Sequence, residues 1–160
     1  MKKTPKKGKK EEFDLVEKNN APWIYSDMVR KHFFNPKNFL KPEEEKTFKY
    51  NAYGEAGSTA CGDLMKFWLW IDPKTEKIKQ ARWRTFGCGS AIASTSILSE
   101  MITEKDGMEI KKAVIITPQA IIKRLGGLPN IKIHCSVLGD QALCAAIENY
   151  QKTKNRSRLN

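Results

Sequence analysis

Hydrophobic periodicity changes once along this chain, close to Ser90, and this change limits the fold more than any other feature. Before it, apolar and polar residues alternate, which is typical of half-buried strands. After it, apolar residues recur every three or four positions, as on one face of a helix. A chain with its strands first and its helices afterwards is expected to form an α+β domain rather than a doubly wound parallel sheet.

The alternating part predicts three strands, over residues 47–53, 64–71 and 78–86. The polar segment DPKTEK joins the second and third strands and places Pro73 at a turn, so we expect an antiparallel hairpin there. The sheet is therefore expected to be small, three-stranded and antiparallel.

Helices are expected to pack on this sheet, one before the strands and the others in the C-terminal half. The N-terminal helix begins at Ser26, an N-cap candidate, and ends at the Asn-Pro pair that follows Phe34. A second helix runs from Ser90, and a final one follows Ser136. Between them, a short helix has distinct boundary residues: Thr117 as N-cap, Pro118 at the first helical position, and Gly126 with Gly127 as the stop. The apolar stripe of the second helix consists of Ile92, Thr95, Leu98 and Ile102.

The length of 160 residues fits one domain, expected at 22–152, between a lysine-rich tail at 1–21 and a basic tail at 153–160. Of the net charge of +11, residues 1–20 carry +3 and residues 151–160 carry +4. We interpret these ends as solvated segments rather than a nucleic-acid surface. As a hypothesis, they help to dock acidic partners, and unchanged affinity for such a partner after their deletion would contradict it.

A cytoplasmic location is expected, because the N-terminus lacks the apolar segment of a secretory signal and no run approaches the roughly 18 apolar residues of a membrane helix. That compartment keeps thiols reduced, so the four cysteines are not expected to form disulfides. Metal or sulfur chemistry is then the alternative for them.

Potential metal ligands occur at three boundaries between expected elements: Cys61 with Asp63, Cys88, and His134 with Cys135. Loop ends of this kind can meet at one edge of a sheet. Cys88 and Cys135 each precede an expected helix, whose amide dipoles favour a thiolate, and thiolates bind iron, zinc and copper(I). Glycines next to these cysteines leave room for a cofactor and for amide donors: Gly62, Gly87 and Gly89.

Residue types and spacing alone leave several interpretations open. The spacing is unlike that of a CxxC finger, so the three cysteines form either one metal site or separate buried positions. Cys144, inside the final helix, and His32, in the N-terminal helix, are expected to be structural. A thiol enzyme based on Cys135 and His134 is disfavoured, because adjacent residues rarely place a base within hydrogen-bond reach of a nucleophile.

A zinc-stabilised, basic nucleic-acid-binding module is the alternative from another functional class. It would combine the cysteines and Asp63 with tryptophans that alternate with basic residues: Trp68, Trp70 and Trp83 with Lys66, Arg82 and Arg84. Base stacking would require these rings to be exposed on one face of the sheet.

Three segments, ACGDLMKFWLWI, RTFGCGSAIASTSILSE and LGGLPNIKIHCSVLGDQALCAAIENY, closely resemble the IscU/NifU-type iron–sulfur cluster assembly scaffolds. The segment YSDMVRKHFFNPKNF is similar to the N-terminal helix of that family, and the resemblance covers roughly residues 23–152 in the same order. It implies a scaffold, not an enzyme, on which a transient 2Fe-2S cluster is built from iron and desulfurase-derived sulfur and then transferred.

By this resemblance, Cys61, Cys88 and Cys135 are the sulfur ligands of the cluster, and Asp63 is a labile ligand that completes the site or helps to release the cluster. His134 is the alternative fourth ligand, and Cys135 is also the thiol that accepts sulfur as a persulfide. Zinc is implied to occupy the same residues in the apo form. Lys132 is expected to supply positive charge beside the site.

The resemblance also implies the partners: a cysteine desulfurase, an iron or electron donor, and recipient apoproteins, but neither a membrane nor nucleic acid. Residues 128–132 read LPNIK where the family's chaperone-recognised segment reads Leu-Pro-Pro-Val-Lys, so the sequence does not assign a heat-shock-type chaperone. It also leaves open whether one chain holds the cluster or a homodimer shares it.

Overall fold

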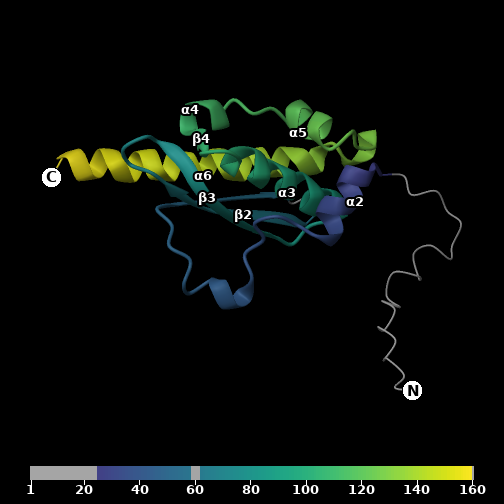
Figure 1. Cartoon of the computed structure of the whole chain (residues 1–160), viewed down its shortest axis with the longest axis horizontal. Coiled ribbons are helices and arrows are strands. Elements are labelled where there is room, and N and C mark those ends of the chain that lie inside the picture. The colour runs from purple at the N-terminus through teal and green to yellow at the C-terminus, as the bar shows by residue number, and fades with distance from the viewer. Residues whose placement is uncertain (1–24, 59–61, 160) are drawn as a thin grey trace, which may run out of the picture.

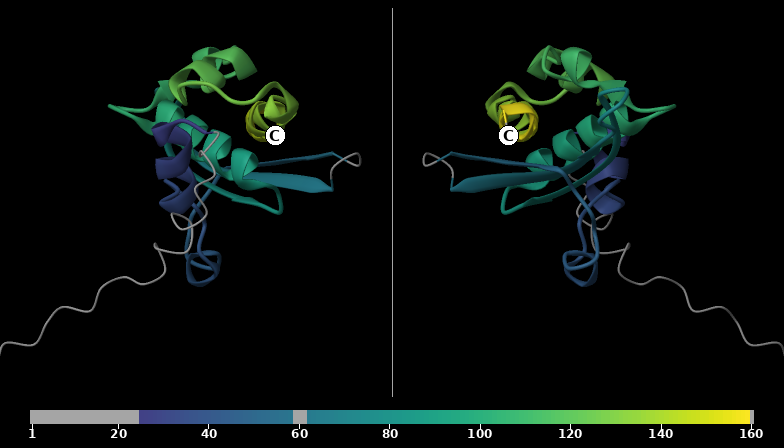
Figure 2. Two further views of the ribbon diagram at one scale, coloured as in Figure 1. Left: turned by 90° about the vertical axis from the view of Figure 1, so that its right-hand side faces the viewer. Right: turned by 90° about the vertical axis from the view of Figure 1, so that its left-hand side faces the viewer.

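The structure is a computed structural model that describes residues 25–58 and 62–159, without the side chains at positions 58, 131, 134 and 135. Its sheet is antiparallel, in the order β1-β2-β3-β4, and α3 and α6 lie on one face of it with α4 and α5 beyond them (Figures 1 and 2). The expected α+β fold is confirmed. In chain order, the described elements are α2 (Asp27–Phe34), η2 (Pro42–Glu44), β1 (Ala52–Ser58), β2 (Asp63–Ile71), β3 (Lys77–Thr85), α3 (Gly89–Thr103), β4 (Met108–Glu109), α4 (Ile110–Ala113), α5 (Pro118–Arg124), η3 (Asn130–Lys132) and α6 (His134–Leu159).

The expected hairpin of β2 and β3 is confirmed, with Phe67 opposite Trp83 in the antiparallel register. The expectation of three strands is incomplete, because β3 also pairs with β4, a strand of two residues. Two residues are too short a run to show a period of two, so the sequence pattern could not reveal β4.

The prediction for the first strand is wrong. Alternation placed it at 47–53, whereas β1 runs from Ala52 to Ser58 and reads AYGEAGS. The small residues reflect the close approach of α6: a Cβ added to Gly54 would lie 2.1 Å from the backbone nitrogen of Ala146 and 2.5 Å from the carbonyl oxygen of Ala142. Because tertiary packing rather than strand propensity selects the residues here, the sequence lacks a strand signal.

The predicted boundaries of the two short helices are confirmed. The amide of Val29 donates to Ser26 Oγ at 3.2 Å at the start of α2, and the amide of Ala120 donates to Thr117 Oγ1 at 3.2 Å at the start of α5. After α5 the backbone turns into the left-handed region, with φ of 76° at Gly126 and 106° at the following glycine.

The helix expected from Ser90 is α3, and it is buried on nearly all sides rather than along one stripe. Buried serine hydroxyls of α3 form hydrogen bonds to carbonyl oxygens of the preceding turn. Ser99 Oγ, for example, donates to the carbonyl oxygen of Ser96 at 2.7 Å. The four residues of the predicted stripe are therefore only part of the contact surface of α3.

The final helix starts earlier and ends later than expected. The sequence placed its start after Ser136, but α6 begins at His134, so Cys135 lies in its first turn instead of before it. Residues 153–159 prolong α6 rather than forming a separate tail. The tail expected at 1–21 lies outside the described residues.

The core lies between the inner face of the sheet and the helices α3 and α6, where Phe67, Leu69, Ile97 and Leu143 are fully buried. No helix within residues 25–58 and 62–159 is long and apolar enough to cross a membrane.

The tryptophans do not form the exposed row that a base-stacking platform would need. Trp83 is fully buried on the helix-covered face, where its Nε1 donates to the carbonyl oxygen of Lys37 at 2.7 Å. On the opposite face, Trp68 is 9% exposed and lies 5.4 Å from the ring of Tyr53, while Trp70 is 38% exposed. This arrangement removes the main support for the nucleic-acid interpretation.

Candidate metal centre

The start of β2 and the end of β3 meet at one end of the molecule. The carbonyl oxygen of Leu64 accepts hydrogen bonds from Thr85 Oγ1 at 2.8 Å and from the amide of Phe86 at 2.9 Å. These bonds bring the carboxyl group of Asp63 against the loop after β3: a Cβ added to Gly87 would lie 3.3 Å from Asp63 Cγ. Two of the three predicted ligand segments are therefore adjacent.

Asp63 is 9% exposed, and within the described residues no hydrogen bond or ion pair engages its carboxylate. Its oxygens are therefore available to accept a hydrogen bond or to bind a metal ion.

Cys88 follows Gly87 directly and is the N-cap residue of α3, with an extended backbone at φ −75° and ψ 173°. Its carbonyl oxygen accepts from the amide of Ile92 at 3.1 Å, which begins the helix. The first turn of α3 contains no acidic residue, and the positive end of the helix dipole acts on this half-buried cysteine. The dipole favours the thiolate form, as the sequence suggested, while the Asp63 carboxylate beside Gly87 opposes it.

The helix α6 brings the third predicted segment to the same end. A Cβ added to Gly139 would meet Leu98 Cδ2 at 3.3 Å and Thr95 Oγ1 at 3.5 Å, so the second turn of α6 packs on the middle of α3. The two helices run in the same direction, with both N-termini towards α2 (Figure 1). The backbone of His134 and Cys135, in the first turn of α6, thus lies at the same end of the molecule as Cys88.

Both glycines around Cys88 have a packing reason within the chain. A Cβ at Gly87 would come within 2.9 Å of Ala91 Cβ and 3.0 Å of Thr85 Oγ1, and one at Gly89 would come within 3.1 Å of the Phe33 ring. Gly62 instead adopts a φ of 70° in open surroundings, a conformation that favours glycine. Their expected role beside a cofactor stays a prediction.

The complete ligand set also stays a prediction. Cys61 lies outside the described residues, as do the side chains of His134 and Cys135. Within the part of the chain that the structure describes, no three His, Cys, Asp or Glu side chains are grouped for a metal ion. Lys132, the expected positive charge, is partly buried at the end of η3, just before α6.

The environments of His32 and Cys144 agree with structural roles. His32 is 1% exposed and its Nδ1 lies 2.7 Å from Ser96 Oγ; burial lowers its pKa. Cys144 lies 3.9 Å from the carbonyl oxygen of Val114, and burial raises the pKa of its thiol, with Asp140 adding a smaller effect of the same sign. A raised pKa keeps this thiol protonated and poorly reactive.

Sequence reasoning missed two aromatic side chains around the candidate site. Phe33 was assigned only to a packing helix, yet its ring lies against Gly89 and so fixes the segment that carries Cys88. Phe86, two residues before Cys88, is 67% exposed although it was assigned to a strand. Exposure of a large apolar ring beside a candidate site could be found only from the structure, since strand periodicity gives no sign of it.

Taken together, these observations define an α+β domain in which the Asp63 carboxyl group lies beside the loop that carries Cys88, with the first turn of α6 at the same end of the molecule. The family model described as "NifU-like N terminal domain" matches residues 24–157. The chain belongs to this family. The resemblance noted from the sequence is thereby confirmed.

Two curated relatives illustrate the range of the family. The "Nitrogen fixation protein NifU" of Azotobacter chroococcum mcd 1 is 44% identical over 135 residues, which are 84% of this chain and 41% of that protein. The "Iron-sulfur cluster assembly scaffold protein IscU" of Aquifex aeolicus (strain VF5) is 41% identical over 132 residues, which are 82% of this chain and 79% of that protein. The chain thus spans about two fifths of that NifU relative and most of the IscU relative.

A solved structure supports the fold. The crystal structure of a nitrogen-fixing NifU-like protein (N-terminal) from Brucella abortus aligns with a TM-score of 0.60 at 12% identity, covering 79% of this chain and 94% of that one. At this identity the likeness concerns the fold alone.

Proposed function

We propose that this protein is a scaffold on which a 2Fe-2S cluster is assembled and from which it is transferred to recipient apoproteins. The observation that carries the proposal is the position of Asp63, whose carboxylate has no partner among the described residues, against the glycine that precedes Cys88 at the N-terminus of α3. The relative in Aquifex aeolicus is itself named as such a scaffold.

In this proposal the cluster is cargo, held by Cys61, Cys88 and Cys135 with Asp63 as the labile ligand and His134 as its alternative. Thiolates bind iron strongly, whereas a single carboxylate is a harder and weaker ligand for a cluster iron. The N-termini of α3 and α6 lie at this end without an acidic residue in either first turn, so both dipoles stabilise anionic sulfur there. A weakly held fourth position makes release easier.

Sulfur arrives by thiol exchange with a cysteine desulfurase. The thiolate of Cys135 attacks the terminal sulfur of the desulfurase persulfide, a new S–S bond forms, and the desulfurase cysteine leaves as a thiolate. The bound sulfur is then reduced to sulfide by an external electron donor and meets iron delivered by a donor. These thiol steps suit a reducing compartment, which we propose is the cytoplasm.

Anaerobic reconstitution tests the proposal. The protein is incubated with ferrous iron, cysteine and a cysteine desulfurase, and the product is examined by visible absorption and by iron and acid-labile sulfide analysis. We expect sulfur-to-iron charge-transfer bands with equal amounts of iron and sulfide. Retention of zinc without any sulfide would contradict the scaffold function, while zinc that is displaced by cluster formation agrees with occupancy of the same residues in the apo form.

Matched variants assign the ligands. Cys88→Ala should lose the cluster, and Cys144→Ala should keep it, because Cys144 lies inside α6 beside the carbonyl oxygen of Val114 and burial raises the pKa of its thiol. Asp63→Ala should lengthen the lifetime of the cluster against chelators. Faster loss of the cluster from Asp63→Ala would contradict the release role of this carboxylate.

A further inference from the structure

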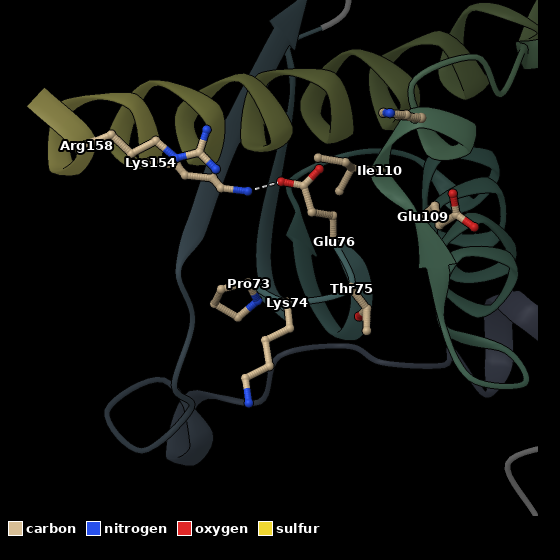
Figure 3. A pocket seen from close by; sticks show the side chains of 9 residues that line it. Pro73, Lys74, Thr75, Glu76, Glu109, Ile110, Lys154 and Arg158 are labelled. Carbon is tan, nitrogen blue, oxygen red and sulfur yellow. Dashed lines mark hydrogen bonds and ion pairs between the residues drawn. The ribbon is translucent and has the colours of Figure 1, made fainter.

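A second surface with recognisable chemistry lies at the opposite end of the molecule from the candidate metal centre. A pocket of about 540 Å³ is formed by the turn between β2 and β3, the start of α4 and the last turns of α6 (Figure 3). Lys154 and Arg158 lie 20 and 24 residues after His134 on α6, and at about 1.5 Å per residue this separation is about 30 Å or more. A partner bound here would leave the metal centre uncovered.

The frame of this pocket is fixed by interactions between distant segments. Lys154 on α6 forms an ion pair with Glu76 on the turn, as Figure 3 shows. The carbonyl oxygen of Glu76 accepts from the amide of Ile110 at 3.0 Å, which ties the turn to α4. The turn, α4 and the end of α6 are thus held as one unit.

Glu76 adopts a φ of 53°, which is uncommon for a residue with a side chain. Hairpin turns usually place glycine or asparagine at such a position, because a side chain there is strained. The side chain of Glu76 has a structural role, because its carboxylate forms the ion pair that holds Lys154 at the pocket. Strain that is retained for a specific contact is a common property of binding surfaces.

The pocket has an excess of positive charge. Its lining contains four basic and two acidic residues, and both acidic ones are engaged: Glu76 by Lys154, and Glu109 by Lys112 at 3.6 Å. Three basic side chains remain, and within the described residues none of them pairs with a carboxylate: Lys74, Lys111 and Arg158. All three are exposed, and Lys74 extends away from the Lys154–Glu76 pair in Figure 3. They lie around the pocket as exposed cations, and Lys74 is also near enough to Asp72 to contribute to the lowered pKa of that carboxyl group.

We infer that this pocket, the basic turn pocket, is a docking site for an acidic segment of a partner protein. Carboxylates of such a segment would pair with Lys74, Lys111 and Arg158, and the apolar surfaces of Pro73 and Ile110 would contact its aliphatic parts. Glu76 and Glu109 would repel a continuous phosphate backbone or a sheet of anionic headgroups, whereas a peptide can place its few carboxylates beside the cations alone. This inference concerns a surface outside the metal centre and does not depend on the proposed function.

The test measures binding of a fluorescent peptide, in which glutamates alternate with leucines, to the full chain by anisotropy. The same peptide with glutamine for glutamate is the ligand control. The triple variant Lys74→Glu, Lys111→Glu, Arg158→Glu should weaken binding of the acidic peptide by about tenfold or more, because three attractive pairs become repulsive. Binding should also weaken as salt is raised, since these charges are exposed.

A control variant carries the same change in net charge at exposed lysines elsewhere: Lys37→Glu, Lys46→Glu and Lys123→Glu. It should keep the affinity within about twofold, because separate exposed charges contribute little to binding at a distance. Equal loss in both triple variants would overturn the inference, since net charge alone would then explain binding.

Two further measurements keep the test decisive. In the unmodified chain, addition of the acidic peptide should shift the amide resonances of Thr75 and Lys111. If neither resonance shifts, the inference is overturned, and this result does not depend on whether the triple variant folds. Vesicles of anionic lipid and duplex RNA are titrated as alternative ligands. Binding of the vesicles or of the RNA through the three basic residues, without binding of the peptide, would also overturn the inference.

Discussion

The two ends of α6 use carboxylates in opposite ways. At the turn end, Glu76 is paired with Lys154, and Asp106 is paired with Lys77 at 2.9 Å and Lys79 at 2.5 Å. At the metal-centre end, Asp63 is nearly buried, and within the described residues it has no cationic partner. The difference shows that charge pairs connect the segments at the turn end, while at the other end close packing of small residues holds the Cys88 loop beside a carboxylate without such a pair.

The contact between β1 and α6 lies between these two ends of the helix. Disrupting it should cause the largest loss in the free energy of unfolding. In Gly54→Ala the new methyl group would lie 2.1 Å from the backbone nitrogen of Ala146, where no side-chain rotation gives relief. We expect a loss of about 3 kcal/mol in the free energy of unfolding, measured by urea titration.

Gly57→Ala is the control on the same strand, because its methyl group would meet only ordinary contacts at 3.6 and 3.7 Å. Its free energy of unfolding should stay within about 1 kcal/mol of the unmodified chain. Equal losses in the two variants would show that strand propensity, and not the approach of α6, explains the glycines of β1.

The second prediction concerns the packing around the metal centre. Gly87→Ala would place a methyl group 2.9 Å from Ala91 Cβ and 3.3 Å from Asp63 Cγ, so we expect a loss of about 2 kcal/mol. Ala91→Gly costs about 1 kcal/mol by itself, as glycine does in a helix, so the double variant should be less destabilised than the sum of the two, with a coupling energy of about 1 kcal/mol in a double-mutant cycle. Strictly additive losses would mean that these two residues do not make the critical contact.

Elements whose signals are local could be predicted from the sequence. The caps of α2 and α5 depend on single side chains, Ser26 and Thr117, that bond amides three residues away. The β2–β3 hairpin follows from alternation and a polar turn. These features require no knowledge of the rest of the fold.

Features that depend on distant segments could not be predicted. β1 consists of small residues because α6 lies on it, and the pair of Lys154 with Glu76 joins positions 78 residues apart in sequence. The residue types at the metal centre suggested a thiol site, but the contact of Asp63 with the Cys88 loop arises from the register of β2 on β3. The basic turn pocket likewise required three elements to be brought together.

The third prediction uses the pH dependence of the packing beside the metal centre. Burial lowers the pKa of His32, with Lys31, Lys37 and Arg124 acting in the same direction and Glu100 opposing them. The unfolded chain therefore binds a proton more readily, and stability should fall as the pH drops below about 6.5 towards the lowered pKa.

The variant His32→Gln isolates this effect, because glutamine can bond Ser96 but does not titrate in this range. Urea unfolding at pH 7.5 and pH 5.5, roughly on either side of the ordinary histidine value, should show a smaller pH difference in the variant than in the unmodified chain. An unchanged difference would assign the pH dependence to other groups.

The smallest effect is expected at the turn end, from the pairing of Asp106. Hydrogen bonds from Lys79 and then Lys77 lower the pKa of this exposed carboxyl to about 2. Because the folded-state pKa lies below the unfolded value of 3.8, the contribution to stability is present above pH 3.8 and is lost as the pH falls towards 2. Asp106→Asn should therefore differ from the unmodified chain at pH 6 more than at pH 2 in low salt, and about 1 M salt should remove the difference because the screening length falls to ~3 Å. A difference that persists in high salt would indicate that the side chain acts through hydrogen-bond geometry and not through charge, and would weaken the contrast with Asp63 at the other end.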